Sequence, residues 1–403
     1  MTFGKHMLAE WPLEPGVTYL NHGTVGVTPN RVMAAQREIR DAIERQPSRF
    51  MLRELTATSF GRPRNETPRL RAAADVVAGF LGAKGEDLVF VDNATTAVNS
   101  ILRSFPFNAG DEVLVTDLSY GGVVRAALFA ARERGATVRT VTMPYPFRAE
   151  SLVDAYATAV GPKTRLAIVD HTTAESGLVF PLRETAARLR AQGVAVLGDG
   201  AHAPGSIPVD IASLGVDWYV ANLHKWGWSP RSSGILWASP ERQAGLHPTV
   251  ISWGLDQGYT AEFDMLGTRD PSAHLAAPAA IGLMREWGVE AVQRYNHDLA
   301  WSGARHLAER WQTGFDVPEA LTGTMATVPL PAAMGETREE ALTLRDALLF
   351  EDHIEVQMHA YRDRIWARIS AQIYNDLADI DRLAAAVGRR LPAAAQTVMP
   401  SRR

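Results

Sequence analysis

The sequence contains no cysteine among its 403 residues. This absence excludes disulfide bonds and metal sites with cysteine ligands, and it excludes any mechanism that uses a cysteine nucleophile. We predict no metal site. The sequence also lacks an uninterrupted apolar run of membrane-spanning length and a hydrophobic signal segment at its start, so we predict a cytoplasmic protein without a membrane partner.

Charge of one sign is not in excess either. The formal net charge is −4, and no run of lysine or arginine stands out. The sequence therefore gives no sign of binding to nucleic acid or to an anionic membrane, and it indicates a small molecule as the partner.

The sequence does contain short β-rich runs that alternate with helix-length segments from about Val17 to Ser272. This pattern is typical of an α/β unit with a mostly parallel sheet, in which ligands bind at the carboxyl ends of the strands. Seven strands are predicted, over residues 88–91, 112–115, 137–141, 166–169, 194–197, 218–221 and 234–237.

The segment from about Leu275 onward is richer in alanine, arginine and leucine. Its patterns predict helices over 276–288, 289–311 and 376–390, with strands over 325–328, 353–358 and 365–369, which indicates an α+β unit. A chain of this length accommodates two domains. We predict a large α/β domain over 17–274 and a small α+β domain over 275–395, with residues 1–16 packing on the small domain.

The most informative feature is the pairing of Asp199 with Lys225, which follows it by 26 residues. Each residue follows an apolar strand. Pyridoxal phosphate chemistry needs this pair, because a lysine amine forms a Schiff base with the cofactor aldehyde and a carboxylate keeps the pyridine nitrogen protonated. Alone, such an aspartate is usually a helix cap and such a lysine is usually solvated. Together they predict a pyridoxal phosphate site.

Two further segments fit this site. Thr95 and Thr96 open a helix directly after a strand, and a helix N-terminus with hydroxyl groups is suited to a phosphate, although an ordinary threonine-capped helix has the same pattern. Tyr120 follows another strand and is placed to stack on a pyridine ring, with a buried structural tyrosine as the alternative.

Other candidates surround the lysine and the aspartate. His202 lies three residues after Asp199, within reach of the cofactor edge. Asn222 and His224 precede Lys225 and are candidates for phosphate binding, while the aromatic residues that follow it predict a lowered pKa for the lysine. The turn 170–173 ends a strand and predicts polar groups facing the same crevice, although a turn with satisfied hydrogen bonds would have the same sequence. In the predicted small domain, Arg368 is suited to a bidentate grip on a substrate carboxylate.

As a set, these motifs resemble the class V aminotransferase family of fold-type I pyridoxal phosphate enzymes, and the resemblance covers nearly the whole chain. It is carried by Asn21-His22-Gly23, Asn93-Ala94-Thr95-Thr96, Asp199-Gly200-Ala201-His202, His224-Lys225, Gly267-Thr268-Arg269-Asp270, and Arg368-Ile369-Ser370 with Tyr374-Asn375. It implies a mostly parallel seven-stranded sheet in the large domain and a smaller α+β domain at the C-terminal end.

The resemblance also implies residue roles. Lys225 would be the Schiff-base lysine, Asp199 the partner of the pyridine nitrogen and His202 a contact to the phenolic oxygen or the imine. Phosphate binding would fall to Thr95, Thr96, Asn222 and His224, with Thr268 reaching across from a second subunit, so a homodimer with shared active sites is expected. Thr173 and Tyr120 would contribute to cofactor binding, and Asn21, His22 and Arg368 to substrate binding.

Within the family the sequence is most similar to the isopenicillin N epimerase-like branch. It departs from the cysteine desulfurase pattern, because it has no cysteine to accept sulfur and Ala174 stands where that branch usually has asparagine. Persulfide transfer is therefore not expected. We predict an enzyme that epimerises or racemises the α-carbon of an amino acid or a related substrate. Tyr259, His22 and Tyr120 are unranked candidates for the acid on the opposite face.

Three alternatives remain open. The same α-carbanion can expel a β-substituent, which would make the protein a C–S β-lyase, or it can be reprotonated on the cofactor, which would make it an aminotransferase. A catalytically silent ligand-binding scaffold is the third alternative, which the joint presence of Lys225, Asp199 and Arg368 disfavours.

Overall fold

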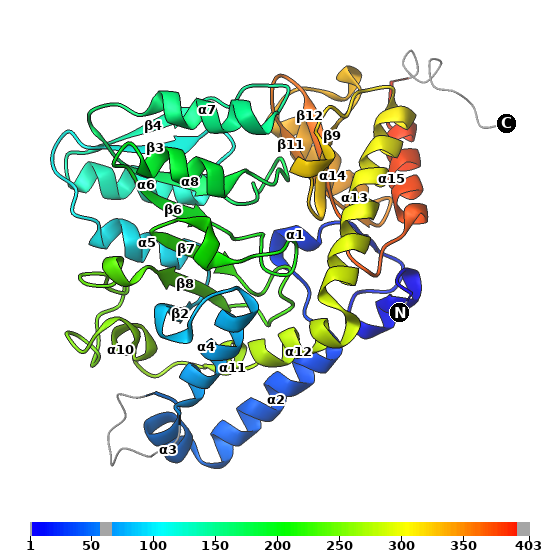
Figure 1. The fold of residues 1–403 in the computed structure, drawn as a ribbon. Helices are drawn as coiled ribbons and strands as arrows, with labels where there is room; N and C mark the ends of the chain where they lie inside the picture. The colour runs from blue at the N-terminus through cyan, green and yellow to red at the C-terminus, as the bar shows by residue number, and fades with distance from the viewer. Residues whose placement is uncertain (1, 57–66, 393–403) are drawn as a thin grey trace.

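A seven-stranded sheet forms the larger part of the computed structural model, which describes residues 2–56 and 67–392 (Figure 1). The strand order is β2-β8-β7-β6-β5-β3-β4. The strands are β2 (Leu88–Val91), β3 (Glu112–Thr116), β4 (Thr137–Val141), β5 (Thr164–Asp170), β6 (Ala195–Asp199), β7 (Trp218–Asn222) and β8 (Gly234–Ala238). All seven predicted strands are confirmed, each within two residues of its predicted bounds.

The sheet is mostly parallel, as predicted. Strands β3 to β7 pair in parallel, and β8 runs antiparallel to both β7 and β2. Parallel strands bring their carboxyl ends to one edge of the sheet. Asp170, Asp199 and Asn222 end β5, β6 and β7, so three polar side chains gather at this edge.

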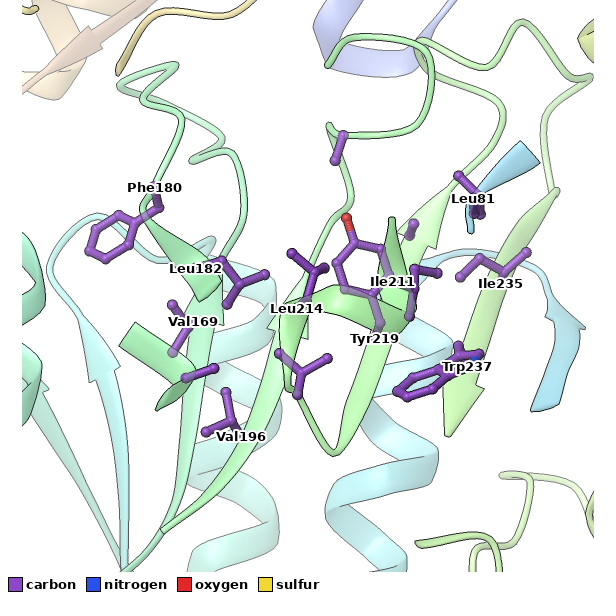
Figure 2. Close-up of a cluster of buried hydrophobic side chains, with 14 of the residues drawn as sticks. Leu81, Val169, Phe180, Leu182, Val196, Ile211, Leu214, Tyr219, Ile235 and Trp237 are labelled. Carbon is purple, nitrogen blue, oxygen red and sulfur yellow. The ribbon is translucent and has the colours of Figure 1, made fainter. Parts of the chain in front are cut away.

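Both faces of the sheet are covered by helices, which explains why β2, β6, β7 and β8 are buried at every position. Along β2, Leu88 and Phe90 pack with one hydrophobic cluster, while Val89 and Val91 pack with the other. Figure 2 shows part of the first cluster, where strand residues such as Val169 lie near helix residues. The helices of the first cluster are α4 (Arg69–Phe80), α7 (Ala149–Ala159), α8 (Leu182–Arg190) and α9 (Ile211–Leu214), and those of the second are α5 (Ala94–Ser104), α6 (Gly121–Glu133) and α10 (Tyr259–Asp264).

A second, antiparallel sheet has the order β11-β12-β9. Its strands are β9 (Met325–Pro329), β11 (Gln357–Ala360) and β12 (Ile365–Ser370), packed against α13 (Val289–Trp311), α14 (Arg338–Phe350) and α15 (Leu377–Arg389). The single strand predicted over 353–358 is wrong. The chain instead forms β10 (Ile354–Glu355), which pairs in parallel with β1 (Thr18–Tyr19), and then β11, because consecutive residues here pair with two different partners.

Shorter and connecting helices complete the described chain. They are α1 (His22–Val25), α2 (Asn30–Arg45), α3 (Pro47–Arg49), α11 (Ser272–Leu275) and α12 (Ala277–Trp287). Over residues 2–56 and 67–392, no helix combines the length and apolar character needed to cross a membrane.

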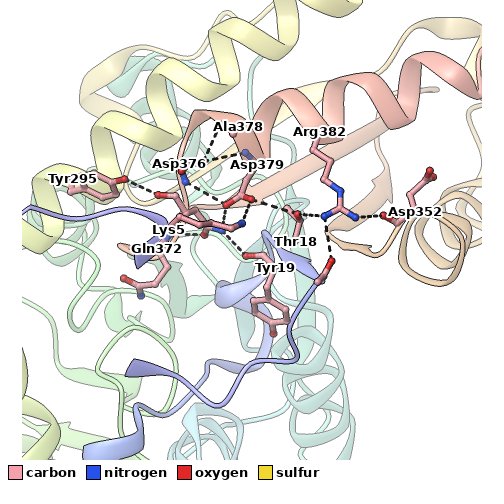
Figure 3. Close-up of polar contacts among 12 residues, drawn as sticks. Lys5, Thr18, Tyr19, Tyr295, Asp352, Gln372, Asp376, Ala378, Asp379 and Arg382 are labelled. Carbon is pink, nitrogen blue, oxygen red and sulfur yellow. Dashed lines mark hydrogen bonds and ion pairs between the residues drawn. The ribbon is translucent and has the colours of Figure 1, made fainter. Parts of the chain in front are cut away.

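The N-terminal segment is tied to α15 by a polar network (Figure 3). Lys5 forms an ion pair with the buried Asp379, which also accepts hydrogen bonds from Thr18 Oγ1 at 3.5 Å and from Asn375 Nδ2 at 2.9 Å. Arg382 donates to Thr18 Oγ1 at 3.0 Å. The division into domains at 274 and 275 stays a prediction, and residues 393–395 of the predicted small domain lie outside the described residues.

Candidate active site

A cavity of about 570 Å³ opens at the carboxyl edge of β5, β6 and β7. It brings together most of the residues predicted for the site, although they come from distant parts of the sequence. The predicted residues that line it are Thr95, Thr96, Tyr120, Asp199, His202, Asn222, His224 and Lys225.

Lys225 is held by a chain of directed contacts. Its Nζ lies 3.0 Å from His202 Nε2, and Trp226 Nε1 donates to His202 Nδ1 at 3.4 Å. An indole N–H is only a donor, so Nδ1 carries no proton and the neutral imidazole carries its proton on Nε2. His202 therefore donates to Lys225, and the lysine accepts with the lone pair of a free amine.

Electrostatics favour the same form of the lysine. Burial, together with the charge of Arg368, lowers the pKa of Lys225 to about 8, against the opposing charge of Asp199. Burial also holds the pKa of His202 well below its usual value, so its imidazole is neutral. A free amine is both the nucleophile and the base that pyridoxal phosphate chemistry requires.

A glycine allows the lysine loop to pack closely on the N-terminal segment. Gly26 has φ of 68°, and a Cβ atom there would lie 1.8 Å from the carbonyl oxygen of His224. Only glycine tolerates both this backbone conformation and this approach. His22, four residues earlier, donates from Nε2 to the carbonyl of Lys225 at 3.1 Å and accepts from the hydroxyl of Tyr374 at 2.9 Å.

Two buried carboxyl groups lie side by side at the strand ends. Asp170 and Asp199 are register partners on β5 and β6, 5% and 4% exposed. Burial raises the pKa of both, and the charge of Asp199 raises that of Asp170 further, while Lys225 lowers that of Asp199. Burial therefore disfavours two negative charges at this edge, and Lys225 favours the charge on Asp199.

The N-terminus of α5 lies in the cavity wall. Asn222 Oδ1 accepts from the amide of Ala94 at 2.9 Å, and Asn93, rather than a threonine, caps the helix through the amide of Thr96 at 3.0 Å. Within the described residues the Thr95 hydroxyl makes no hydrogen bond, so it stays available to a ligand. Helix dipole, hydroxyl group and amide together suit a phosphate.

His224 is neutral in this wall. Its Nδ1 donates to the carbonyl of Ser233 at 3.0 Å, which leaves Nε2 as an acceptor. Burial and the charge of Lys225 lower its pKa to about 4, against the opposing hydrogen bond to Ser233. A phosphate dianion would favour the protonated form of His224, because it supplies the missing counter-charge.

Arg368 is buried without an acidic partner in the described chain. It is 4% exposed, and its guanidinium donates to Asn21 Oδ1 at 3.0 Å, to Thr24 Oγ1 at 2.7 Å and to the carbonyl of Ala174. Its Nε has no partner among the described residues, and burial lowers its pKa to about 10. Arg368 forms no ion pair among the described residues, although the charge of Glu175 opposes the lowering of its pKa. Thr24 and Ala174 line the cavity, so this cation lies directly behind the cavity wall.

Five predicted residues do not line the cavity, and they are Asn21, His22, Thr173, Thr268 and Arg368. Asn21 donates from Nδ2 to Glu355 at 2.6 Å and accepts from Arg368, so its amide is used within the protein. His22 is fully buried, and both of its nitrogens bind protein groups, so it supports the lysine loop. The Thr173 hydroxyl lies 2.6 Å from that of Ser176 and accepts from the amide of Leu178 at 2.8 Å. Thr268 lines a separate cavity of about 120 Å³, so its predicted role across a subunit boundary stays a prediction.

Sequence reasoning missed Thr24 and Arg231, which line the cavity, and it predicted Thr172 only as part of the turn 170–173. The Thr172 hydroxyl is buried without a hydrogen-bond partner in the described residues, as expected of a group that awaits a ligand. Side chains alternate along an extended segment, so Thr172 faces the cavity and Thr173 faces away. Arg231 follows Lys225 in the same loop, and this proximity was the only signal in the sequence.

Comparison with known proteins identifies the family. The model of class-V aminotransferases matches residues 53–383. The chain belongs to the class-V aminotransferase family. Two relatives are a putative L-cysteine desulfhydrase of Oryza sativa subsp. japonica, 32% identical over 93% of this chain and 83% of its own length, and the isopenicillin N epimerase of Amycolatopsis lactamdurans, 31% identical over 93% and 95%.

Solved structures confirm fold-type I. The cystine C–S lyase C-DES, in complex with cysteine persulfide, is similar with a TM-score of 0.74, at 22% identity over 93% of this chain and 97% of its own. The cysteine desulfurase CsdA of Escherichia coli gives a TM-score of 0.75 at 20% identity over 98% of each chain. The fold therefore does not exclude desulfuration.

The site of this class-V family member fits its cofactor, pyridoxal 5'-phosphate. Asp199 at the end of β6, Lys225 and the start of α5 all line this cavity. A carboxylate there would suit a pyridine nitrogen, the amine an aldehyde and the helix N-terminus a phosphate. The Thr172 hydroxyl and the Nε atom of Arg368 have no hydrogen-bond partner among the described residues, and a bound cofactor and substrate would supply partners to them. When bound, the cofactor accepts the electron pair released at a substrate α-carbon.

Proposed function

We propose that this pyridoxal phosphate enzyme removes the α-proton of an amino acid and expels a β-substituent, with a C–S bond as the bond broken. The observation that carries this proposal is the 3.0 Å contact of Lys225 with His202 beside the acid-free Arg368. It supports a single base in the cavity with a cation behind the wall that is suited to a substrate carboxylate, and β-elimination requires only one base.

The residues divide the work as follows. Arg368 binds the substrate carboxylate and so fixes the α-carbon. Lys225 takes the α-proton on Nζ, and His202 holds that amine in its basic form. Asp199 keeps its negative charge against the pyridine nitrogen. The electrons of the broken C–H bond form the new double bond, the C–S electrons leave with sulfur, and the products after hydrolysis are pyruvate, ammonia and a thiol or sulfide.

Sulfur would leave this site in soluble form. The chain has no cysteine to carry a persulfide, so desulfuration by transfer to the protein is not proposed. Relatives named L-cysteine desulfhydrase support a released sulfur product, at 30% to 32% identity over 93% of the chain.

Epimerisation is the second candidate, because Tyr120 lines the cavity and relatives named isopenicillin N epimerase are equally similar. It needs an acid on the opposite face of the α-carbon. His22 lies outside the cavity, and Tyr259 is buried in the hydrophobic cluster around α5 and α6, with its hydroxyl donating to Leu236 at 2.8 Å. Of the three predicted acids, Tyr120 lines the cavity, so epimerisation would depend on this residue.

We further propose a homodimer, in which Thr268 completes the neighbouring site, and a cytoplasmic location. An exposed apolar side chain beside Thr268 supports the dimer, since Trp253, which lines the same cavity as Thr268, is 68% exposed. Sedimentation of the purified protein as a single monomer would contradict this assembly.

The test is incubation of the purified enzyme with L-cysteine, L-cystine, S-methyl-L-cysteine and L-alanine in deuterium oxide, followed by NMR. Pyruvate with released thiol or sulfide supports the elimination. Deuterium exchange with inversion and no keto acid would show an epimerase instead, and keto acid from alanine an aminotransferase. No exchange with any amino acid would favour a silent scaffold.

A further inference from the structure

Two arginines hold the same short stretch of chain beside the cavity, residues 21–26. Arg368 donates to Thr24 Oγ1 at 2.7 Å, and Arg231 donates from Nη2 to the carbonyl of Gly26 at 3.1 Å. Thr24, Val25 and Arg231 all line the cavity, and Val25 is 45% exposed between the two held residues. The guanidinium groups therefore flank one turn of chain at the cavity mouth.

Neither arginine has a carboxylate partner within residues 2–56 and 67–392. The acids that line the cavity have other partners, since Asp92 pairs with Arg269 at 3.5 Å and Asp170 accepts from Ser119 at 3.0 Å. Asp199 lies beside Lys225. An arginine presents a planar fork of donors that matches a carboxylate, so both guanidinium groups are suited to anions supplied by a ligand.

Arg231 holds the stretch of chain that packs on Lys225. Gly26, whose carbonyl it binds, packs on the backbone of His224 and Lys225, and His22 of the same stretch binds the Lys225 carbonyl. The phosphate end of the cavity, at the start of α5, has its own donors. The guanidinium of Arg231 is thus directed toward the stretch that holds Arg368.

We propose that Arg231 forms a second anion subsite, so that the preferred substrate is an α-amino acid whose side chain ends in a second anionic group. This inference rests on the proposed function, in which Arg368 takes the α-carboxylate. The residues held by the two guanidinium groups, Thr24 and Gly26, are two apart, which is at most about 7 Å along the backbone. A side chain of a few atoms spans that distance.

A matched pair of substrates tests the subsite. S-carboxymethyl-L-cysteine and S-carbamoylmethyl-L-cysteine have the same shape and differ by one negative charge. The wild-type enzyme is expected to have a KM about tenfold lower for the carboxylate than for the amide, because one charge-assisted hydrogen bond contributes a difference of about this size. Arg231→Gln should bring the ratio of the two KM values close to one, and Arg231→Lys should keep part of the preference for the carboxylate.

The control variant is Arg165→Gln, which removes the same charge at the amino end of β5, away from the cavity. It should keep the full preference. Calorimetric binding of both conjugates gives the preference even where turnover is absent. If the wild-type enzyme binds the carboxylate conjugate more tightly than the amide but turns over neither, β-elimination is contradicted and the subsite is not. If it binds the two conjugates equally, the subsite is overturned.

The cofactor phosphate is the other anion within the cavity. Titration of the apoenzyme with pyridoxal phosphate, followed by absorbance, measures whether Arg231→Gln changes cofactor affinity. If Arg231→Gln leaves the affinity for pyridoxal phosphate unchanged but loses the preference for the carboxylate conjugate, the subsite is supported. A weakened affinity with an intact preference would assign Arg231 to the phosphate and overturn the proposal.

Discussion

Two buried charges, Asp379 in α15 and Arg368 in β12, have opposite kinds of surroundings. Asp379 is 3% exposed and has a cation, Lys5, together with donors from Thr18 and Asn375. Arg368 is 4% exposed and has three neutral acceptors but no acid among the described residues. A buried charge costs free energy unless it is paired. The paired charge holds the fold, and the unpaired one is suited to a ligand.

Lys225 extends this comparison, since it too is a buried basic side chain whose hydrogen-bond partner, His202, is neutral. Lys225→Ala should reduce turnover by at least about 10³-fold, because it removes both the attachment point of the cofactor and the base. The free energy of unfolding should hardly change. Activity assays and the visible absorbance of bound cofactor measure this, with the exposed Lys163→Ala as control. Normal turnover by Lys225→Ala would remove the lysine from the mechanism.

Neutralising Arg368 and Asp379 in turn tests whether one charge serves ligand binding and the other serves stability. Arg368→Gln should raise KM for amino acids by about 10- to 100-fold, since a charge-assisted hydrogen bond to the carboxylate is lost, and it should not lower stability. Asp379→Asn should lower the free energy of unfolding by about 1–3 kcal/mol and leave KM unchanged.

Urea unfolding and steady-state kinetics on both variants separate the two roles. A loss of stability in Arg368→Gln with unchanged KM would show that the arginine is structural, and the contrast with Asp379 would disappear.

The lowered pKa of Lys225 gives a pH dependence. Below pH 8 this lysine is protonated and unreactive, and above pH 8 it is the free amine. The rate at which apoenzyme binds pyridoxal phosphate covalently should therefore rise about tenfold from pH 7 to pH 9 and then level off. Stopped-flow absorbance measures this rate. A rate that kept rising to pH 10 would indicate an ordinary, solvated lysine.

The smallest expected effect concerns the proton on His202. Trp226→Phe keeps an aromatic ring against His22 but removes the N–H donor, so the imidazole loses the contact that fixes its tautomer. Turnover should fall by about three- to tenfold. Nitrogen-15 NMR of His202 reads the tautomer directly, and an unchanged spectrum in the variant would mean that Trp226 has no part in it.

The sequence predicted the elements that depend on local pattern. Strand ends carried Asp199 and Asn222 to one edge because parallel strands share an edge, and the apolar strands were recognisable on their own. The direction in which individual side chains point could not be predicted from the sequence. Whether Thr172 or Thr173 faces the cavity, or whether His22 binds substrate or the Lys225 carbonyl, depends on which distant segment packs against it.

The partners of Arg231 and of strand β10 could not be predicted from the sequence for the same reason. The carbonyl that Arg231 binds and the strand that β10 joins both lie more than 200 residues away in the sequence. No local pattern specifies such partners.

The central claim is that Lys225 carries the cofactor, and the chain allows a direct test because it has four lysines, Lys5, Lys84, Lys163 and Lys225. Borohydride treatment of the loaded enzyme fixes the link between cofactor and amine, and mass spectrometry of the peptides locates it. We expect the label on Lys225 alone. A label on any of the other three lysines, or none after full loading, would contradict this account.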